Sequence, residues 1–167
     1  MTFPSQLWAP WRAPYLSAIR RPGRGCFLCQ AARARRGQDR ARLVIERATH
    51  VFVVLNRYPY SNGHVMVAPY RHTARLSSLS QEAAAELVSV AGRMADRLTR
   101  LLHPDGLNIG INLGRAAGAG VPGHLHLHVV PRWIGDTNFM PVLSGTKVIS
   151  QSLSAVYQRL TKLARRR

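Results

Sequence analysis

Three histidines alternate with apolar residues in the run Gly123-His-Leu-His-Leu-His-Val-Val-Pro131. This alternation predicts a β-strand from Leu125 to Val130, ended by Pro131, so that all three imidazoles project from one face at intervals of about 7 Å. The three histidines are His124, His126 and His128. A histidine flanked by two others can keep one ring nitrogen unprotonated and use it as a nucleophile. The alternatives are a chance surface strand of histidines and a metal-binding patch.

A pair of cysteines, Cys26 and Cys29, forms the motif C-F-L-C. In a cytosolic chain such a pair is half of a zinc site, a redox pair or a coincidence. A redox pair normally begins a helix within a βαβ unit, whereas this pair follows a segment rich in proline, glycine and arginine, residues 21–25. Two cysteines cannot complete a tetrahedral site, so zinc is favoured only if two histidines join them.

A glycine-rich segment, residues 114–123, directly precedes the histidines and contains four glycines. Because glycine has no Cβ, backbone N–H groups in such a loop can approach a phosphate closely. Alternatively, this segment is only a flexible connection and binds no phosphate. The candidate substrate contacts in this segment and just before it are Asn112, Gly114, Arg115, Gly120 and Gly123.

The remaining sequence predicts the elements that must position these groups. Runs of β-branched residues between turn-forming residues, and two alternating runs, predict strands at 42–46, 51–56, 64–69, 107–113 and 125–130. Apolar residues at intervals of three and four predict helices at 27–37, from a cap at Ser78 or Ser80 to Leu102, and at 151–163. The segment between residues 58 and 63 reads as a turn that joins two strands.

These elements predict an α+β fold, an antiparallel sheet of about five strands with the helices on one side, among them one long helix and a C-terminal helix. A chain of 167 residues is expected to form one domain. Residues 1–25 are irregular and rich in aromatic residues, which predicts an N-terminal arm. Residues 26–167 are expected to form the single domain, including the C-terminal helix.

The composition excludes several classes of protein. Hydrophobic residues make up 46% of the chain, enough for a packed core, which excludes a disordered protein. The apolar runs are far shorter than the roughly 18 residues that a membrane-spanning helix needs. The first residues lack the basic and apolar regions of a secretion signal, so we expect a cytoplasmic protein without a membrane partner.

The chain is strongly basic, with 24 basic and 7 acidic residues and a net charge of +17. All but two of the basic residues are arginines, which bind phosphate through two parallel hydrogen bonds, so an anionic partner is expected. A GC-rich coding sequence would also enrich arginine. The arginine clusters contain no interleaved aromatic residues, so nucleic-acid binding is compatible with the sequence but not required by it.

The motif His-φ-His-φ-His-φ-φ, where φ is apolar, resembles the signature of the histidine triad (HIT) superfamily of nucleotide hydrolases and transferases. Residues 124–130 match it at every position. Residues 55–69 and the helix after Ser80 resemble the corresponding family segments. Residues 7–12, the C-F-L-C pair, and residues 135–140 and 146–149 are similar to a bacterial subgroup that resembles diadenosine tetraphosphate phosphorylases. The resemblance implies a HIT-like fold over nearly the whole chain.

This resemblance implies nucleotidyl transfer through a covalent histidine. His126 would attack the α-phosphorus of an adenine nucleotide, while His128 and His64 would contact phosphate oxygens. Asn56 matches a position that binds ribose hydroxyls. The implied substrates are dinucleoside polyphosphates such as diadenosine tetraphosphate, with inorganic phosphate as co-substrate. Many relatives carry Gln, Ser or Thr in the loop before the triad, and residues 114–123 contain none of them.

Zinc-containing relatives imply a structural Zn²⁺ held by Cys26, Cys29, His72 and His124. His50 as a ligand, and cysteines without metal, are the alternatives. The family also implies a homodimer or higher homo-oligomer, to which Trp8, Trp11 and Tyr15 of the arm could contribute. Two rival functions stay open: a phosphoramidase-type hydrolase of nucleoside monophosphate conjugates, and a non-catalytic basic nucleotide-binding module.

Overall fold

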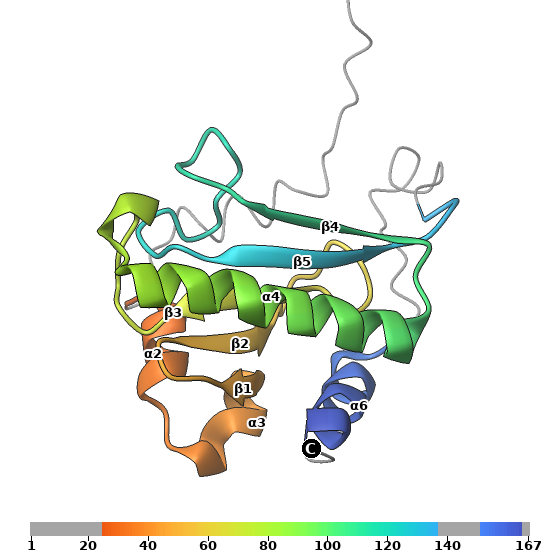
Figure 1. The fold of residues 1–167 in the computed structure, drawn as a ribbon. Helices are drawn as coiled ribbons and strands as arrows, with labels where there is room; N and C mark the ends of the chain where they lie inside the picture. Colours follow the sequence, from red (N-terminus) through yellow and green to blue (C-terminus); the bar gives the residue numbers. More distant parts are fainter. Residues whose placement is uncertain (1–24, 137–150, 165–167) are drawn as a thin grey trace, which may run out of the picture.

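The computed structural model describes residues 25–136 and 151–164 (Figure 1). Five strands form one antiparallel sheet in the order β1-β2-β3-β5-β4. The strands are β1 (Val44–Arg47), β2 (Val51–Leu55), β3 (Val65–Pro69), β4 (Gly106–Ile111) and β5 (Leu127–Arg132). The α-helices in the described part are α2 (Phe27–Arg33), α3 (Asp39–Arg42), α4 (Gln81–Leu102) and α6 (Leu153–Ala164). The expected α+β fold is confirmed.

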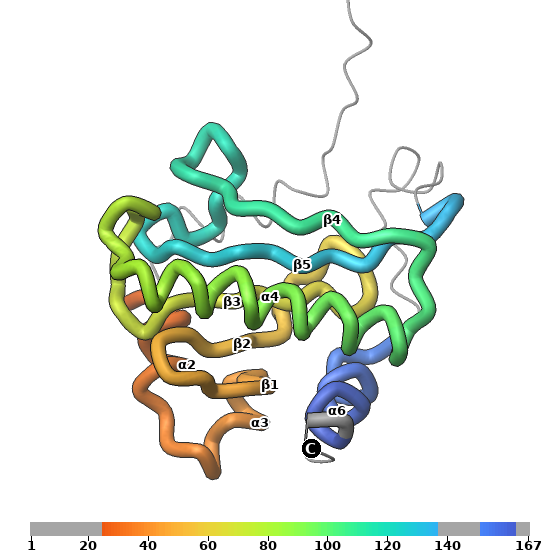
Figure 2. Tube along the Cα trace, in the orientation of Figure 1, coloured from red at the N-terminus to blue at the C-terminus, as the bar shows by residue number. Residues whose placement is uncertain are grey.

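The two faces of the sheet bury alternate residues of the same strands. Val51, Val53 and Leu55 of β2 join the main core with the apolar faces of α4 and α6. Phe52 and Val54 pack instead against α2 on the other face. The tube trace shows α4 running across the sheet with α6 beside its C-terminal half (Figure 2). The expectation of helices on one side alone is therefore wrong, because α2 covers part of the opposite face.

The long helix α4 begins where its sequence predicts. The Ser80 side chain accepts a hydrogen bond from the Ala83 N–H at 3.2 Å, which caps the first turn. The helix buries Leu87, Met94 and Leu98 in the main core. Its C-terminal half fixes the start of β3, since a Cβ added at Gly63 would collide with Leu98 and Leu102. Gly63 also has φ +77°, so glycine is required directly before His64.

Strand β5 differs from its expected bounds at both ends. It starts at Leu127, two residues late, because Leu125 N–H bonds to the Thr73 carbonyl at 2.6 Å instead of to a neighbouring strand. It also continues through Pro131, which pairs with Leu107 of β4. Strand β3 pairs with β5 only as far as Val129, so beyond that point β5 has a neighbour on one side, where a residue without an N–H is tolerated.

Strand β4 lies at an edge of the sheet. Its residues are more exposed than expected for the half-buried strand that the sequence predicts at 107–113. Leu107 and Ile111 pack against the main core, but Ile109 between them is 50% exposed. No helix in the described part of the chain is long and apolar enough to cross a bilayer. The predicted N-terminal arm, with Trp8, Trp11 and Tyr15, lies outside the described residues, as do residues 137–150, so the division at residue 25 stays a prediction.

Candidate active site and metal cluster

Three of the candidate histidines meet on the sheet face opposite α4. His128 lies on β5 beside Met66 of β3, His126 directly precedes β5, and His64 directly precedes β3. The ring centroids of His126 and His128 are 4.8 Å apart, and those of His64 and His128 are 5.0 Å apart. All three side chains are buried. The antiparallel β3–β5 pairing therefore places side by side two histidines that are 64 residues apart in sequence.

One hydrogen bond determines which nitrogen of His126 is free. Its Nδ1 lies 2.7 Å from the backbone carbonyl oxygen of His124. A carbonyl oxygen only accepts, so Nδ1 must carry the proton and Nε2 keeps its lone pair in the neutral ring. Burial lowers the pKa of His126 below its ordinary value, against the opposing effect of this hydrogen bond. The neutral imidazole, with Nε2 available as a nucleophile, is the favoured state near pH 7.

A chain of hydrogen bonds in the same way assigns the protons of His64 and His128. The Tyr60 N–H donates to His64 Nδ1 at 3.0 Å, so the proton of neutral His64 lies on Nε2. That Nε2 lies 2.9 Å from His128 Nδ1, which must accept. His128 therefore carries its proton on Nε2. This atom is buried and has no hydrogen-bond partner among the described residues, so it is a donor available to an incoming ligand.

Burial and the neighbouring His126 lower the pKa of His128 to about 4. In the unfolded chain the pKa would be near 6.5, so the folded state binds fewer protons between these two values. Stability from this group is therefore fully present above pH 6.5 and is lost as the pH falls towards 4. We expect this to cost about 3 kcal/mol in the free energy of unfolding, measured by urea titration across this pH range. His128→Gln should flatten the profile, and an unchanged profile would contradict the assignment.

The structure says less about how Asn56 and the glycine-rich loop would contact a substrate. Asn56 Oδ1 accepts the Tyr58 N–H at 2.9 Å, and its Nδ2 lies 3.2 Å from His64 Nδ1, so the amide supports the loop that holds His64. Gly114 has φ +81°, a backbone conformation that favours glycine, and two loop amides are used in turns within the loop. The exposed residues among the candidates are Gly114, Arg115 and Gly123. The roles of Asn112 and Gly120 in substrate binding stay predictions.

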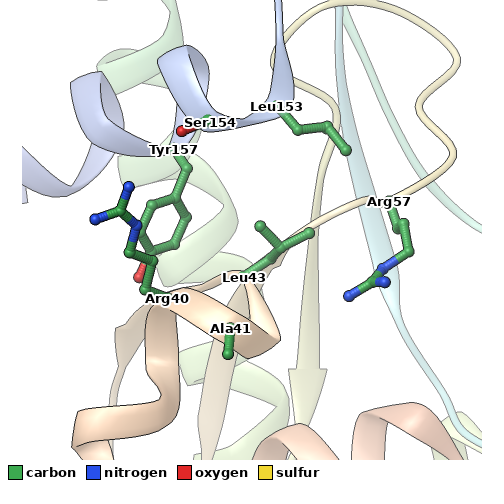
Figure 3. A pocket seen from close by; sticks show the side chains of 7 residues that line it. All are labelled: Arg40, Ala41, Leu43, Arg57, Leu153, Ser154 and Tyr157. Atoms are coloured by element: carbon green, nitrogen blue, oxygen red, sulfur yellow. The ribbon is translucent and has the colours of Figure 1, made fainter.

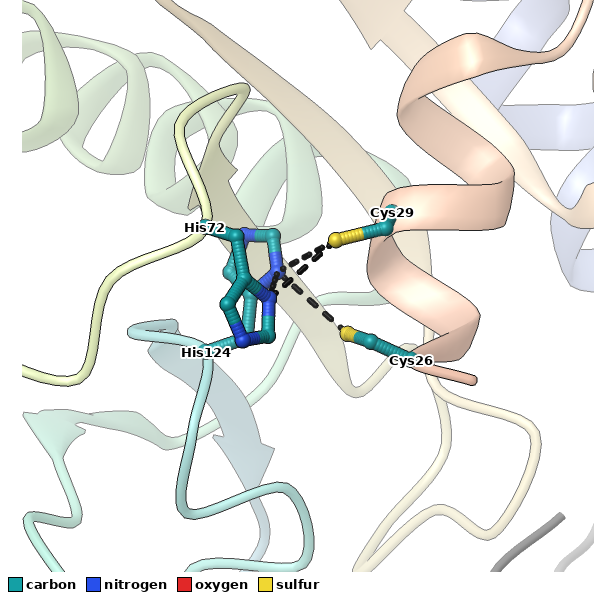
Figure 4. Close-up of side chains that lie close together, drawn as sticks. All are labelled: Cys26, Cys29, His72 and His124. Carbon is teal, nitrogen blue, oxygen red and sulfur yellow. Dashed lines mark hydrogen bonds between the residues drawn. The ribbon is translucent and has the colours of Figure 1, made fainter. Parts of the chain in front are cut away.

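The remaining candidates form a compact metal-ligand cluster (Figure 4). Nδ1 of His124 lies 3.3 Å from Cys26 Sγ and 3.2 Å from His72 Nδ1, and Cys29 Sγ lies 3.2 Å from His72 Nδ1. In a tetrahedral site with zinc–sulfur and zinc–nitrogen bonds of ordinary length, ligand atoms are about 3.3–3.8 Å apart. The four atoms all lie within 4.8 Å of one another. Their types and spacing therefore fit a closed, four-coordinate site that could bind a metal ion.

The orientation of His124 also suits a metal ligand. Its Nε2 lies 2.9 Å from the carbonyl oxygen of Pro69, so Nε2 carries the proton and Nδ1 faces the cluster unprotonated. This side chain lies with His72, at a ring-centroid distance of 5.0 Å, and not in the row with His126 and His128. His124 thus contacts the cysteines of α2, which covers the same sheet face as His126 and His128, but its ring joins the cluster because the chain at this residue has not yet entered β5.

Helix α2 carries the two cysteines and is tied to the sheet by Arg47. The guanidinium of Arg47 donates to the carbonyl oxygens of Ala31, Ala32 and Ala34 at 2.9–3.1 Å and pairs with Asp39 at 2.7 Å. It thus satisfies carbonyls that the end of the helix leaves open. Of the two histidines considered as the third ligand, the structure places His72 in the cluster and not His50.

Sequence reasoning missed the backbone groups that set the proton positions. The Tyr60 N–H and the carbonyls of His124 and Pro69 decide which ring nitrogens are free. The Tyr60 ring also stacks on His64 at a centroid distance of 4.8 Å. No residue type marks a backbone carbonyl as an acceptor, so these contacts have no signal in the sequence.

A separate hollow of about 310 Å³ lies between α3, α6 and the segment after β2 (Figure 3). Arg40 and Arg57 line it together with Leu43, Leu153 and Tyr157, and no acidic side chain does. Leu43 and Tyr157 belong to the core under α4 and α6. None of the candidate histidines or cysteines lines this hollow, so it is distinct from the histidine site.

Comparison with known proteins agrees with this geometry. A family model described as the HIT domain matches residues 36–133. An AP-4-A phosphorylase of Mycobacterium tuberculosis H37Rv is 40% identical over 152 residues, which are 89% of this chain and 78% of that protein. A zinc-bound histidine triad family protein from Mycobacterium smegmatis superposes with a TM-score of 0.65 and 29% identity, over 84% of this chain and 94% of the other. The chain therefore belongs to the HIT-domain, or histidine triad, family.

Proposed function

We propose that this HIT enzyme cleaves dinucleoside polyphosphates, diadenosine tetraphosphate in particular, by phosphorolysis through a nucleotidyl-histidine. The observation that carries the proposal is the hydrogen bond from His126 Nδ1 to the His124 carbonyl, which leaves Nε2 as a buried nucleophile. The 40% identity to an AP-4-A phosphorylase supports the choice of substrate.

The first step transfers an adenylyl group to His126. Its Nε2 attacks the α-phosphorus of one adenosine, the bond from that phosphorus to the bridging oxygen breaks, and ATP leaves. Negative charge develops on the phosphoryl oxygens and the departing oxygen. The buried His128 Nε2–H is positioned to donate to these oxygens, and His64 holds His128 in the tautomer that can donate. Because residues 114–123 contain no Gln, Ser or Thr, His128 and loop amides would take their part.

The second step returns His126 to its starting state. An oxygen of inorganic phosphate attacks the same phosphorus, the phosphorus–nitrogen bond breaks, and ADP leaves. The products of one cycle are ADP and ATP, and no water is consumed. The basic surface and the glycine-rich loop support binding of the two anionic substrates, with Asn56 and residues of the loop as substrate contacts.

The test is incubation of the purified protein with diadenosine tetraphosphate, with and without inorganic phosphate, followed by ion-exchange separation of products. We expect ADP and ATP in equal amounts only when phosphate is present. AMP formed without phosphate would indicate a hydrolase. If there is no turnover, a nucleoside phosphoramidate as substrate separates a phosphoramidase from a nucleotide-binding module.

We also propose that the cluster holds a structural Zn²⁺ on Cys26, Cys29, His72 and His124. A closed Cys₂His₂ site leaves no position for substrate, so the ion would stabilise the fold and join α2 to the segment before β5. Removal by a strong chelator is expected to lower the thermal unfolding midpoint by about 10 °C. Added Zn²⁺ should restore the midpoint in the wild type but not in Cys26→Ser. An identical midpoint in both chelated and zinc-loaded protein would contradict a structural ion.

We propose that the protein forms a homo-oligomer through the exposed edge of the sheet at β4. We place it in the cytoplasm, where nucleotides are available. Ile109 is half exposed on this strand, and an uncovered edge strand is prone to pair with another chain. Ile109→Arg should convert a dimer into a monomer in light scattering, because like charges would meet across the paired edges. Val88→Arg, a change at an exposed position on α4, is the control. A dimer that persists in Ile109→Arg would exclude this edge.

A further inference from the structure

We propose that His124 couples the metal cluster to the nucleophile, so that metal occupancy orients the His126 ring and thereby sets the rate of turnover. In this proposal His72 and Cys29 are positioning residues for a reaction that they do not touch. The role of His126 as nucleophile rests on the function proposed above, whereas the coupling changes only the position of one proton on His126.

A single residue makes both of the relevant contacts. The side chain of His124 presents Nδ1 to the cluster, 3.3 Å from Cys26 Sγ and 3.2 Å from His72 Nδ1. The backbone carbonyl of the same residue accepts the Nδ1–H of His126 at 2.7 Å. His124 is 1% exposed, so few rotamers are open to it. Any shift of its side chain towards or away from the metal therefore moves the carbonyl that orients His126.

The sheet does not hold the backbone at this point. Strand β5 begins at Leu127, and residues 124–126 precede its ladder. Two other contacts hold the segment to the chain beyond β3: His124 Nε2–H donates to the Pro69 carbonyl at 2.9 Å, and Leu125 N–H donates to the Thr73 carbonyl at 2.6 Å. His72, which is exposed, lies between these two carbonyls in sequence and belongs to the cluster.

A metal ion would therefore join the two segments that together fix the acceptor for His126. Without it, the exposed His72 is no longer joined to His124 through an ion, and only the bonds to the Pro69 and Thr73 carbonyls restrain residues 124–126 among the contacts described above, so that these residues can relax. When the carbonyl moves away, the neutral His126 ring is free to carry its proton on Nε2 instead of Nδ1. That tautomer has no lone pair at Nε2 and cannot attack phosphorus. Substrate binding, which this proton does not control, should change little.

The experiment compares His126 in zinc-loaded and chelated protein by ¹⁵N NMR of histidine-labelled protein, without nucleotide, at pH 8. In the zinc-loaded wild type we expect one tautomer, with the proton on Nδ1. In the chelated protein and in Cys29→Ser we expect a substantial fraction of the other tautomer. In the phosphorolysis assay the same samples should show a kcat at least about tenfold lower and a KM within about twofold. Added Zn²⁺ should reverse both changes in the wild type only.

Leu28→Ala is the matched control. Leu28 lies next to Cys29 on α2 and is fully buried, so the substitution loosens the helix without removing a ligand. It should lower thermal stability and leave both the His126 tautomer and kcat unchanged when zinc is present. A tautomer that stays on Nδ1 after zinc is removed, or one that shifts equally in Leu28→Ala, overturns the proposal. Because the NMR measurement needs no substrate, it gives this answer even if the protein does not phosphorolyse diadenosine tetraphosphate.

Discussion

Replacement of His126 by alanine is expected to reduce turnover of diadenosine tetraphosphate at least about 10⁴-fold, because among the three described histidines of the site only His126 has an unprotonated Nε2 to accept the adenylyl unit. Nucleotide affinity should stay near that of the wild type, since the imidazole acts in the transition state and not in ground-state binding. The wild type, quenched in base during turnover with substrate labelled in the adenosine, should carry label on His126. His126→Ala should carry none.

His50→Ala is the control for this experiment. His50 is an exposed histidine in the turn between β1 and β2, and it lies outside both the active-site group and the metal cluster. Its removal should leave kcat and the labelling unchanged. If His126→Ala kept activity within tenfold of the wild type in a preparation free of contaminating enzyme, the nucleophile would have to be sought elsewhere.

Loss of His128 is expected to have the second largest effect, a decrease in kcat of about 10²–10³-fold with a smaller change in KM. Its Nε2–H is a buried donor without a partner in the described part of the chain, so a ligand oxygen is the group that would satisfy it. His128→Ala also leaves the His64 Nε2–H without its acceptor. That variant should therefore lose about 1–3 kcal/mol of stability in urea titration as well.

His128→Gln separates the two effects. A glutamine side chain can place an N–H near the position of Nε2, so this variant should recover at least about tenfold of the rate lost in His128→Ala. Steady-state kinetics of both variants on diadenosine tetraphosphate gives the comparison. Equal rates in the alanine and glutamine variants would show that the donor at Nε2 does not matter for the chemical step.

The elements were predictable because their signals are local. The spacing of Leu87, Met94 and Leu98 shows in sequence which face of α4 is buried, and Ser80 caps it as serine does at helix starts. Strands β2 and β3 were within one residue of their predicted bounds, since β-branched runs end at turn-forming residues. The bounds of β5 failed because its start and end depend on Thr73 and on where β3 stops, which are long-range contacts.

The sheet face that α2 covers could not be predicted from local sequence signals either. Its sequence shows that it is a helix, but its placement on the face opposite α4 comes from long-range contacts: Leu28 packs with Phe52 and Val54, and the Arg47 guanidinium binds the carbonyls at the helix end. An arginine on a strand is ordinarily read as a solvent-exposed group. Nothing in the sequence near Arg47 distinguishes it from the other arginines of this strongly basic chain.

For the candidate site, the sequence alone determined the kinds of chemistry available: imidazoles two residues apart, and two thiols three residues apart that needed two more ligands. Residue types and short spacings carry that information. The resemblance to zinc-containing relatives had already implied His72 and His124 as the two other ligands, and the tertiary structure brings them to the cysteines and leaves His50 outside the cluster. Only the tertiary structure decided which nitrogen of each ring is free. The physical reason is that proton positions follow from backbone carbonyls and N–H groups, which every residue has, and whose directions are fixed only when distant segments pack together.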